Sequence, residues 1–290
     1  MKLLSAVLTC VSMKPAWLNK KINLKNCSVL KEELRDLRLD TVCEQALCPN
    51  IEECFSRKEA TFLILGRYCT RSCSFCNIEK KEPLPPDLNE PIRLAEAVRR
   101  FRLKHVVITS VTRDDLCDGG AGIFAEAVLR VKEGSPGVTV EVLIPDFRLS
   151  LDALRIITES VPNIVAHNIE TIPAFYQLVR QGADYGRSLS LLRIIKKISP
   201  QIKTKSGLML GLGEKEAEVI SVMEDLRSVD CDFLSIGQYL APSQRHYPVK
   251  EYIAPGQFEY YKEKGRQLGF RHIESGPYVR SSYMAAKYLS

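Results

Sequence analysis

From residue 61 onward the chain alternates short apolar runs with amphipathic runs of helical period, for example TFLILG (61–66) and then EPIRLAEAVRRFR (90–102). This alternation is the pattern of β/α units built around a parallel sheet. About six such units fit into residues 61–270, fewer than the eight of a closed barrel, which takes roughly 250 residues. We therefore predict an α/β fold, a partial open (β/α)6 barrel. An open doubly wound sheet is the alternative, because periodicity does not tell whether a sheet curls.

The expected elements follow one another in strict order. The strands share an apolar, β-branched composition and are expected at 61–66, 105–111, 138–144, 163–169, 203–210 and 232–240. The helices share an amphipathic period and are expected at 90–102, 121–132, 151–160, 173–180, 187–198, 215–228 and 256–268. Residues at both ends lack the alternation, so we expect three parts, namely an N-terminal extension (1–60), a barrel domain (61–270) and a C-terminal extension (271–290). Functional groups should gather at the carboxyl ends of the strands.

The composition suits a globular protein with a full core. The chain has 290 residues, 45% hydrophobic and 26% charged, and lysine and arginine exceed aspartate and glutamate by 6 (41 against 35). This small excess, without a basic run, is far from that of a nucleic-acid-binding protein. No apolar run approaches the ~20 residues of a membrane-spanning helix. The opening MKLLSAVLTC resembles a truncated signal sequence, but its apolar core is too short for export. We expect a cytoplasmic protein with neither a nucleic-acid nor a membrane partner.

The ten cysteines are distributed unevenly. Two tight triplets lie between positions 43 and 76, and such clustering in a long chain without a secretion signal indicates metal ligation in a reducing compartment. Of the four scattered cysteines, Cys10, Cys27 and Cys231 are expected to be buried small residues. Cys117 is expected to be an incidental loop thiol.

The downstream triplet, 69-CTRSCSFC-76, begins just after the first expected strand. Its C-x3-C-x2-C spacing places three thiolates in one loop, a suitable tripod for one face of a 4Fe-4S cluster. No nearby cysteine or histidine completes a tetrahedral shell, so one coordination position stays open, as in metal sites used for chemistry. Half of a zinc site, or a redox dithiol at Cys73 and Cys76, is the alternative.

The upstream triplet, 43-CEQALCPNIEEC-54, has the spacing C-x4-C-x5-C and lies in the N-terminal extension. Taken alone, it is compatible with a zinc knuckle, with three buried thiols or with a second cluster. Its spacing does not decide among these three.

Together the two triplets resemble those of lipoyl synthases, which are members of the radical S-adenosylmethionine superfamily. The likeness to the superfamily signature includes an aromatic residue, Phe75, before the third cysteine of the downstream triplet. Phe55 and Cys117 depart from the usual lipoyl synthase pattern, but neither is a ligand position. The likeness covers nearly the whole chain and is carried by KPAWL (14–18), VCEQALCPNIEEC (42–54), FLILGRYCTRSCSFC (62–76), PPDLNEP (85–91), SVTRDDLCDGGA (110–121), HNIET (167–171), SGLMLGLGE (206–214), IGQYLAPS (236–243) and SGPYVRSSY (275–283).

The resemblance implies an enzyme, a sulfurtransferase. Lipoyl synthases insert two sulfur atoms at the sixth and eighth carbons of an octanoyl chain that is amide-linked to a lysine of a carrier protein. Two 4Fe-4S clusters and two molecules of S-adenosylmethionine per turnover are implied as cofactors. By resemblance, Cys69, Cys73 and Cys76 are catalytic and hold the cluster that generates a 5′-deoxyadenosyl radical from S-adenosylmethionine.

By the same resemblance, Cys43, Cys48 and Cys54 hold an auxiliary 4Fe-4S cluster that supplies the sulfur and is consumed. In the family its fourth ligand is a serine of a carboxyl-terminal RSSY motif, and in 280-RSSY-283 we assign Ser282. Iron in such clusters favours soft thiolates, so a hard serine oxygen is easily exchanged. A ligand that must leave is well placed near a chain end, where segments are often mobile. Without the family, two serines in a tail would indicate only a solvated turn.

Cofactor contacts are expected after the fourth strand. There Asn168 and Glu170 of HNIET could hydrogen-bond the ribose or amino groups of S-adenosylmethionine, with Phe75 as a further contact, although a cap for the next helix is the competing role. The glycines of DGGA (118–121) either let the backbone approach a cofactor or form a turn into a helix. His167 is close enough to leave undecided.

The implied partners are octanoylated lipoyl-carrier proteins, namely the glycine cleavage H protein and the acyltransferase subunits of 2-oxoacid dehydrogenases. An electron donor such as flavodoxin or ferredoxin, and an iron–sulfur carrier that rebuilds the auxiliary cluster, complete the set. One alternative is another sulfur-inserting or methylthiolating enzyme of the superfamily, acting on a biotin precursor or on transfer RNA, although no basic, aromatic RNA-binding domain is visible. Another is a cysteine-rich electron carrier or a zinc-stabilised binding module, for which this scaffold is larger than needed.

Overall fold

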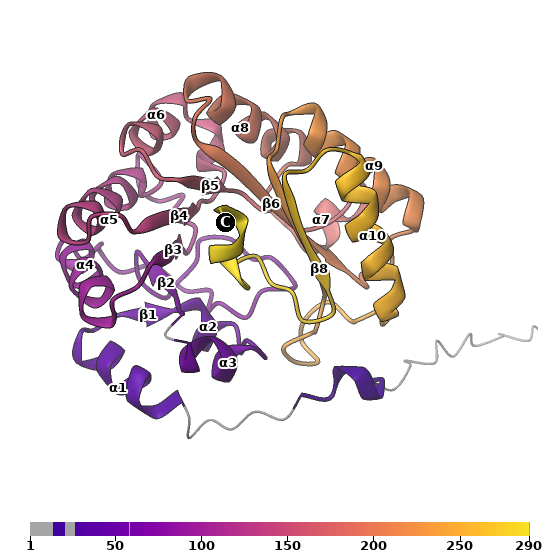
Figure 1. Ribbon diagram of the computed structural model, residues 1–290, viewed down its shortest axis with the longest axis horizontal. Helices are drawn as coiled ribbons and strands as arrows, with labels where there is room; N and C mark the ends of the chain where they lie inside the picture. Colours follow the sequence, from indigo (N-terminus) through magenta and orange to yellow (C-terminus); the bar gives the residue numbers. More distant parts are fainter. Residues whose placement is uncertain (1–13, 21–26, 58, 290) are drawn as a thin grey trace, which may run out of the picture.

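The computed structural model describes residues 14–20, 27–57 and 59–289, and its centre is one eight-stranded sheet with the strands in chain order, β1 to β8. β1 pairs antiparallel with β2, and every later pair is parallel. The sheet curls around a central space, and β1 and β8 are its two edges (Figure 1). The predicted partial open barrel is therefore confirmed, and the sheet does not take the doubly wound form.

Six of the parallel strands, β2 to β7, are those that the sequence predicts. The eighth, β8, lies within the expected C-terminal extension and was not predicted, because its HIESG sequence alternates buried and partly exposed side chains and lacks a continuous apolar run. The strands are β1 (Asp40–Thr41), β2 (Thr61–Ile64), β3 (His105–Ser110), β4 (Thr139–Leu143), β5 (Ile164–Ala166), β6 (Lys203–Leu210), β7 (Phe233–Gln238) and β8 (His272–Gly276).

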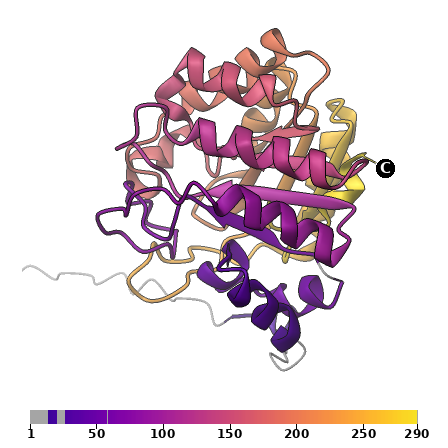
Figure 2. The same ribbon diagram turned by 90° about the vertical axis from the view of Figure 1, so that its left-hand side faces the viewer.

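Helices cover the outer face of the sheet. Figure 2 shows α4, α5 and α6 packed side by side in this outer layer, and α8, α9 and α10 continue it around the sheet (Figure 1). The predicted helix at 173–180 is a 3-10 turn, η4, followed by the short α7. The helices are α1 (Ser28–Asp36), α2 (Val42–Gln45), α3 (Ile51–Ser56), α4 (Glu90–Phe101), α5 (Ala121–Gly134), α6 (Leu151–Glu159), α7 (Tyr176–Val179), α8 (Tyr185–Ile198), α9 (Glu216–Ser228) and α10 (Pro255–Gln267), with 3-10 turns η1 (Ala16–Leu18), η3 (Phe147–Leu149), η4 (Pro173–Phe175) and η5 (Ala285–Leu289).

The turn after β2 directs the chain into the downstream cysteine loop. Leu65 and Gly66 both have left-handed φ angles, 68° and 88°. Glu90 at the start of α4 accepts the Leu65 N–H at 2.8 Å, and the Leu65 carbonyl accepts from Arg113 at 3.1 Å. A Cβ on Gly120 would lie 2.2 Å from the Leu65 side chain, so only glycine fits there. Side chains from two neighbouring units thus hold this turn in place.

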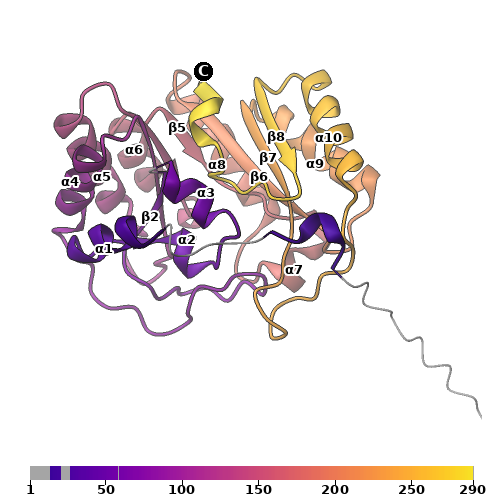
Figure 3. The ribbon, with the colours of Figure 1, turned by 60° about the horizontal axis from the view of Figure 1, so that its bottom comes forward.

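The N-terminal extension packs onto the barrel instead of forming a separate body. Its helices α2 and α3 lie beside β2 and close to the C-terminal segment (Figure 3). Buried side chains of the extension, among them Cys27, Leu34 and Phe55, belong to the same apolar cluster as the barrel strands. This continuous core fixes the upstream cysteine triplet relative to the sheet.

The C-terminal segment enters the barrel and ends there (Figure 1). Tyr288 of η5 is buried, and its ring packs edge-on against Phe233 and lies 4.7 Å from the His272 ring. The Lys205 ammonium, which forms a fully buried ion pair with Glu141 at 3.0 Å, lies 3.8 Å from the centre of the Tyr288 ring. The expectation that Ser282 sits on a mobile tail is therefore wrong, because the chain beyond it is anchored in the core.

Glu90 makes the stability of this fold depend on pH. Burial raises the pKa of Glu90 to about 7, and the Leu65 N–H only partly offsets the effect. Between the ordinary pKa near 4.5 and pH 7 the unfolded chain releases this proton first, so stability falls as pH rises through that window. Glu90→Gln keeps the acceptor oxygen and should raise the free energy of unfolding by about 1–3 kcal/mol at pH 8 but not at pH 4.

Urea unfolding at the two pH values measures this difference. Glu96→Gln on the exposed side of α4 is the matched control and should change stability by less than about 0.5 kcal/mol at either pH. A Glu90→Gln effect that is equal at pH 4 and pH 8 would contradict the assignment.

Candidate functional site

The downstream cysteine loop, residues 67–80, leaves the carboxyl end of β2 and crosses the ends of neighbouring units. The Thr70 N–H donates to the Thr112 carbonyl just beyond β3, at 3.0 Å. The Ser74 N–H donates to the Val179 carbonyl at the end of α7, also at 3.0 Å. Backbone hydrogen bonds thus place all three cysteines of this triplet at the end of the barrel where the sequence predicts function.

Arg71, between the first and second of these cysteines, clamps the loop to two strands. Its guanidinium bridges Asp114 at 2.8 Å and Asp146 at 2.6 Å, just after β3 and β4 respectively. Burial lowers the pKa of Arg71, but the hydrogen bonds that Arg71 donates to the two carboxylates outweigh burial and leave that pKa raised. Sequence reasoning missed this clamp, and its only signal was an acidic residue directly after each of two parallel strands.

The thiols of this loop are held in a dry environment. Burial raises the pKa of Cys73, and it raises the pKa of Cys76 to about 12. The Arg71 N–H points at the Cys69 sulfur at 3.5 Å. Because metal ligation requires thiolates, metal binding at this loop would release the thiol protons and form metal–sulfur bonds in their place.

A large pocket opens beside this loop at the carboxyl ends of β5, β6 and β7, and we call it the lumen pocket. Its volume is about 1190 Å³ including its mouth, somewhat above the ~300–1,000 Å³ typical of small-molecule sites. Cys76 lines it, whereas Cys69 and Cys73 do not. The other lining residues that concern the site are Phe75, Asn168, Glu170, Gly207, Met209, Ser235, Tyr239, Leu240, Ala241, Arg280 and Ser281.

The three predicted cofactor contacts, Phe75, Asn168 and Glu170, thus meet in one pocket. Glu170 has a left-handed φ of 66°, a strained conformation that is common at functional sites. Its carboxyl accepts from Asn168 at 3.0 Å, and burial raises its pKa against the opposing charge of Arg180. Neither side chain caps the following helix.

Two further expectations are settled by geometry. His167 is buried with hydrogen bonds at both ring nitrogens, to the Ile144 carbonyl and the Ser188 hydroxyl, and burial lowers its pKa to about 3. It is a structural residue. The DGGA glycines form the turn into α5, where the Asp118 carboxylate accepts the N–H groups of Gly120 and Gly122.

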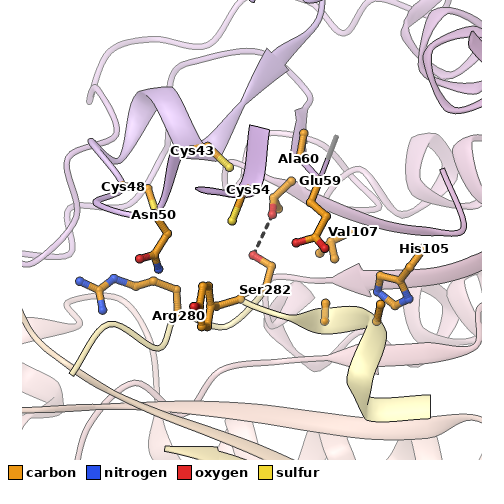
Figure 4. Close-up of a pocket in the computed structure, with 14 residues that line it drawn as sticks. Cys43, Cys48, Asn50, Cys54, Glu59, Ala60, His105, Val107, Arg280 and Ser282 are labelled. Atoms are coloured by element: carbon orange, nitrogen blue, oxygen red, sulfur yellow. Dashed lines mark hydrogen bonds between the residues drawn. The ribbon is translucent and has the colours of Figure 1, made fainter. Parts of the chain in front are cut away.

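The upstream triplet lines a second pocket, which we call the N-terminal pocket (Figure 4). Cys43 of α2, Cys48 of the following turn and Cys54 of α3 face it from one side. Ser282 faces it from the other side (Figure 4). The volume of the N-terminal pocket is about 520 Å³ including its mouth. The pocket is also lined by Asn50, Glu59, Ala60, Thr61, His105, Val107, Arg280, Tyr283, Ala285 and Ala286.

Two of these sulfurs are neutral thiols in the chain alone, because burial raises the pKa of Cys43 and of Cys54 to about 12 in each case. Among the described residues, no three Cys, His, Asp or Glu side chains converge as the ligands of one ion do. A zinc site aims its ligands at a single ion, whereas a cubane takes one ligand at each of its irons. Three thiols and one hydroxyl around a pocket therefore fit a cluster better than one zinc ion.

The segment Arg280 to Tyr283 lies between the two pockets, together with the turn at 46–50 that follows α2. Arg280 lines both of them. Ser281 donates to Asn168 Oδ1 at 2.9 Å on the lumen side, and Tyr283 donates to Glu53 at 2.8 Å beside Cys54. We call residues 280–283 the dividing segment. Among the described residues, only Arg280 lines both cavities.

The scattered cysteines are placed as follows. Cys27 and Cys231 are buried, as expected, and Cys117 is an exposed loop thiol outside both pockets. Cys10 lies outside the described residues.

The Arg71 clamp leads to a stability prediction. Arg71→Met removes a buried cation and leaves Asp146 with Arg187 as its other partner, at 3.1 Å. We expect a loss of about 3 kcal/mol in the free energy of unfolding, since breaking a buried ion pair leaves an uncompensated charge. Arg148→Met is the matched control, because Arg148 is exposed and reaches Asp114 only at 3.3 Å. Equal losses in the two variants on chemical denaturation would refute the clamp.

Comparison with known proteins agrees with this geometry. The Radical SAM superfamily model matches residues 63–226. Proteins named lipoyl synthase from Geobacter metallireducens and Caldanaerobacter subterraneus subsp. tengcongensis are 57% and 53% identical to this chain, covering 95% and 96% of it and 97% of each relative. Another, from Geobacter sulfurreducens, is 57% identical over 96% of this chain and 91% of its own length.

Solved structures share the fold at low sequence identity. Methylornithine synthase has a TM-score of 0.55 at 17% identity, covering 73% of this chain and 63% of its own. Streptococcus suis SuiB bound to S-adenosylmethionine has a TM-score of 0.58 at 13% identity, covering 86% of this chain and 61% of its own. The chain thus spans under two thirds of those longer proteins, and the likeness shows the fold alone.

Proposed function

Because this chain belongs to the lipoyl synthase family within the radical S-adenosylmethionine superfamily, we propose that it converts a protein-bound N6-octanoyl-lysine to the lipoyl form. Two sulfur atoms are inserted, at the sixth and eighth carbons of the chain. When bound, the two 4Fe-4S clusters supply the electron that cleaves S-adenosylmethionine and the sulfur that is inserted. Cys69, Cys73 and Cys76 hold the first cluster.

The observation that supports this function is the pair of cysteine pockets with one wall in common. An enzyme that activates a carbon at one site and gives it sulfur from another needs both sites within reach of a single acyl chain. Here Arg280 of the dividing segment lines both the lumen pocket and the N-terminal pocket, and the residues of the turn at 46–50 line one or the other. We assign Cys43, Cys48 and Cys54 to the auxiliary cluster, with Ser282 as the fourth ligand.

The walls of the lumen pocket suit the two molecules that must meet there. One wall carries Asn168 and Glu170, whose amide and carboxyl can bind the polar groups of S-adenosylmethionine, and Phe75 offers an aromatic face. Other lining residues, Met209, Tyr239, Leu240, Ala241 and Pro242, are suited to an octanoyl chain. Tyr239 is buried and the others are partly buried, and ligands that fill the pocket would displace water that could otherwise quench a reactive radical.

Lipoyl-carrier proteins are the partners implied by the family. We propose the glycine cleavage H protein and the acyltransferase subunits of 2-oxoacid dehydrogenases as carriers, flavodoxin or ferredoxin as electron donor, and an iron–sulfur carrier for rebuilding the auxiliary cluster. None of the helices in residues 14–20, 27–57 and 59–289 is both long and apolar enough to cross a bilayer. We propose a cytoplasmic location from the clustered, unpaired cysteines, which suit a reducing compartment.

Anaerobic turnover tests the function. The reconstituted chain should bind about eight irons and about eight sulfides, four per cluster. It should convert an octanoyl-lysyl peptide to the lipoyl form and release two equivalents of 5′-deoxyadenosine for each product. Cys117→Ser is the matched control and should keep all the iron, whereas Cys54→Ala should lose about half. A single colourless zinc ion, with no product by mass spectrometry, would refute the proposed function.

Ser282→Ala separates the two halves of the reaction. The variant keeps the downstream loop and the lumen pocket, so it should still cleave S-adenosylmethionine. The rate of lipoyl product formation should fall at least about a hundredfold, because removing one preorganised polar group from a reaction site commonly lowers the rate by a factor of that size. Both products are measured by mass spectrometry in one reaction. Full sulfur insertion by Ser282→Ala would show that the ligand assignment is wrong.

A further inference from the structure

Thr61, the first residue of β2, has a polar contact that the proposed function does not use. Its side chain is buried, and its Oγ1 donates a hydrogen bond to Ser282 Oγ at 2.8 Å, marked by the dashed line in Figure 4. Within residues 14–20, 27–57 and 59–289, Thr61 is the hydrogen-bond partner of the Ser282 hydroxyl. A residue of the rigid sheet therefore meets the serine that we assign as a ligand.

The direction of this hydrogen bond matters. Because Thr61 is the donor, the bond does not use the Ser282 proton. It can persist when Ser282 Oγ gives up that proton to bind a metal, and a donor facing a charged oxygen makes a stronger hydrogen bond than one facing a neutral oxygen. The contact is thus compatible with both the free hydroxyl and the ligating oxygen.

Thr61 also lies against a second assigned ligand. Cys43 and Thr61 both line the N-terminal pocket, and Thr61 partly offsets the burial that raises the pKa of the Cys43 thiol. Cys43 comes from α2, and Ser282 comes from the C-terminal segment. Thr61 is therefore the sheet residue at which two ligands from distant parts of the chain meet.

The neighbours of Ser282 are held by other groups. Ser281 is bound to Asn168, Tyr283 to Glu53, and Tyr288 is buried further on. These contacts fix the backbone of the dividing segment but leave the Ser282 side-chain torsion free. A threonine hydroxyl on a strand restricts that torsion, because the β-branched side chain itself has few rotamers.

Given the proposed function, we propose that Thr61 is a positioning residue of the auxiliary site. Its hydroxyl holds Ser282 Oγ facing the N-terminal pocket and sets how long this oxygen stays bound to iron. Thr61 lines the N-terminal pocket and not the lumen pocket, where we place S-adenosylmethionine and the octanoyl chain. The competing role, a hydrogen bond that only stabilises the fold, predicts no effect on the iron once the protein is folded.

Iron release tests the proposal. All proteins carry Cys69→Ala, Cys73→Ala and Cys76→Ala, so that bound iron reports the auxiliary site alone. In this background Thr61→Val removes the hydroxyl and keeps the shape, Thr61→Ser keeps the hydroxyl, and Ser282→Ala is the reference without a ligand oxygen. Thr109→Val is the matched control, since Thr109 of β3 is buried and donates to the Leu143 carbonyl at 2.9 Å.

We expect Thr61→Val to release iron to a chelator about tenfold faster than the parent, approaching Ser282→Ala, since a hydrogen bond to a charged group is of this size. Thr61→Ser and Thr109→Val should stay within about twofold of the parent. The Mössbauer spectrum of ⁵⁷Fe-loaded Thr61→Val should also lose part of the signal of the oxygen-ligated iron.

Each other outcome counts against the proposal. Release from Thr61→Val at the parent rate, or more slowly, would overturn it, and so would an equal acceleration in Thr109→Val. Equal rates in the parent and Ser282→Ala would overturn both this proposal and the Ser282 assignment. That result would leave the turnover assay of the intact enzyme as a separate test, so failure here is distinguishable from failure of the proposed function.

Discussion

The placement of the dividing segment is the constraint on which the rest of the site depends. Residues 280–283 reach the middle of the barrel because β8 brings the chain to its carboxyl end and η5 anchors the chain again near Phe233 and Lys205. Gly237 makes this path possible, since a Cβ there would lie 2.0 Å from the Val279 carbonyl. The C-terminal segment is therefore held at both ends by β8 and η5, and it lies between the two pockets.

The pockets on both sides of the dividing segment contain cysteine thiols, which are soft metal ligands. Burial raises the pKa of Cys43, Cys54 and Cys76 to about 12, so these three thiols are neutral in the chain alone and carry no mutual charge repulsion before a cluster forms. Other polar contacts hold the backbone near the cysteines. The clamp of Arg71 with Asp114 and Asp146, and the hydrogen bond of Tyr283 to Glu53, fix backbone next to the two triplets.

Much of the fold is predictable from local sequence, whereas the assembly of the site is not. The strands β2 to β7 were predictable because apolar and β-branched residues cluster in each of them between amphipathic helices. β8 was not, since a half-exposed edge strand has a weaker pattern. The cysteine spacing alone indicated the downstream cluster, but Ser282 was reached only through the family resemblance. Nothing in the periodicity of the sequence brings Thr61, Cys43 and Ser282 to one place, because their contact depends on how the extension and the C-terminal segment pack on the sheet.

The central claim is that one chain holds two clusters on opposite sides of the dividing segment, and iron anomalous diffraction from crystals of the reconstituted protein tests it most directly. The account predicts two iron peaks. One should be bounded by Cys69, Cys73 and Cys76, and the other by the three upstream cysteines with Ser282 Oγ bonded to iron. A single peak, or two peaks on the same side of residues 280–283, would contradict the account.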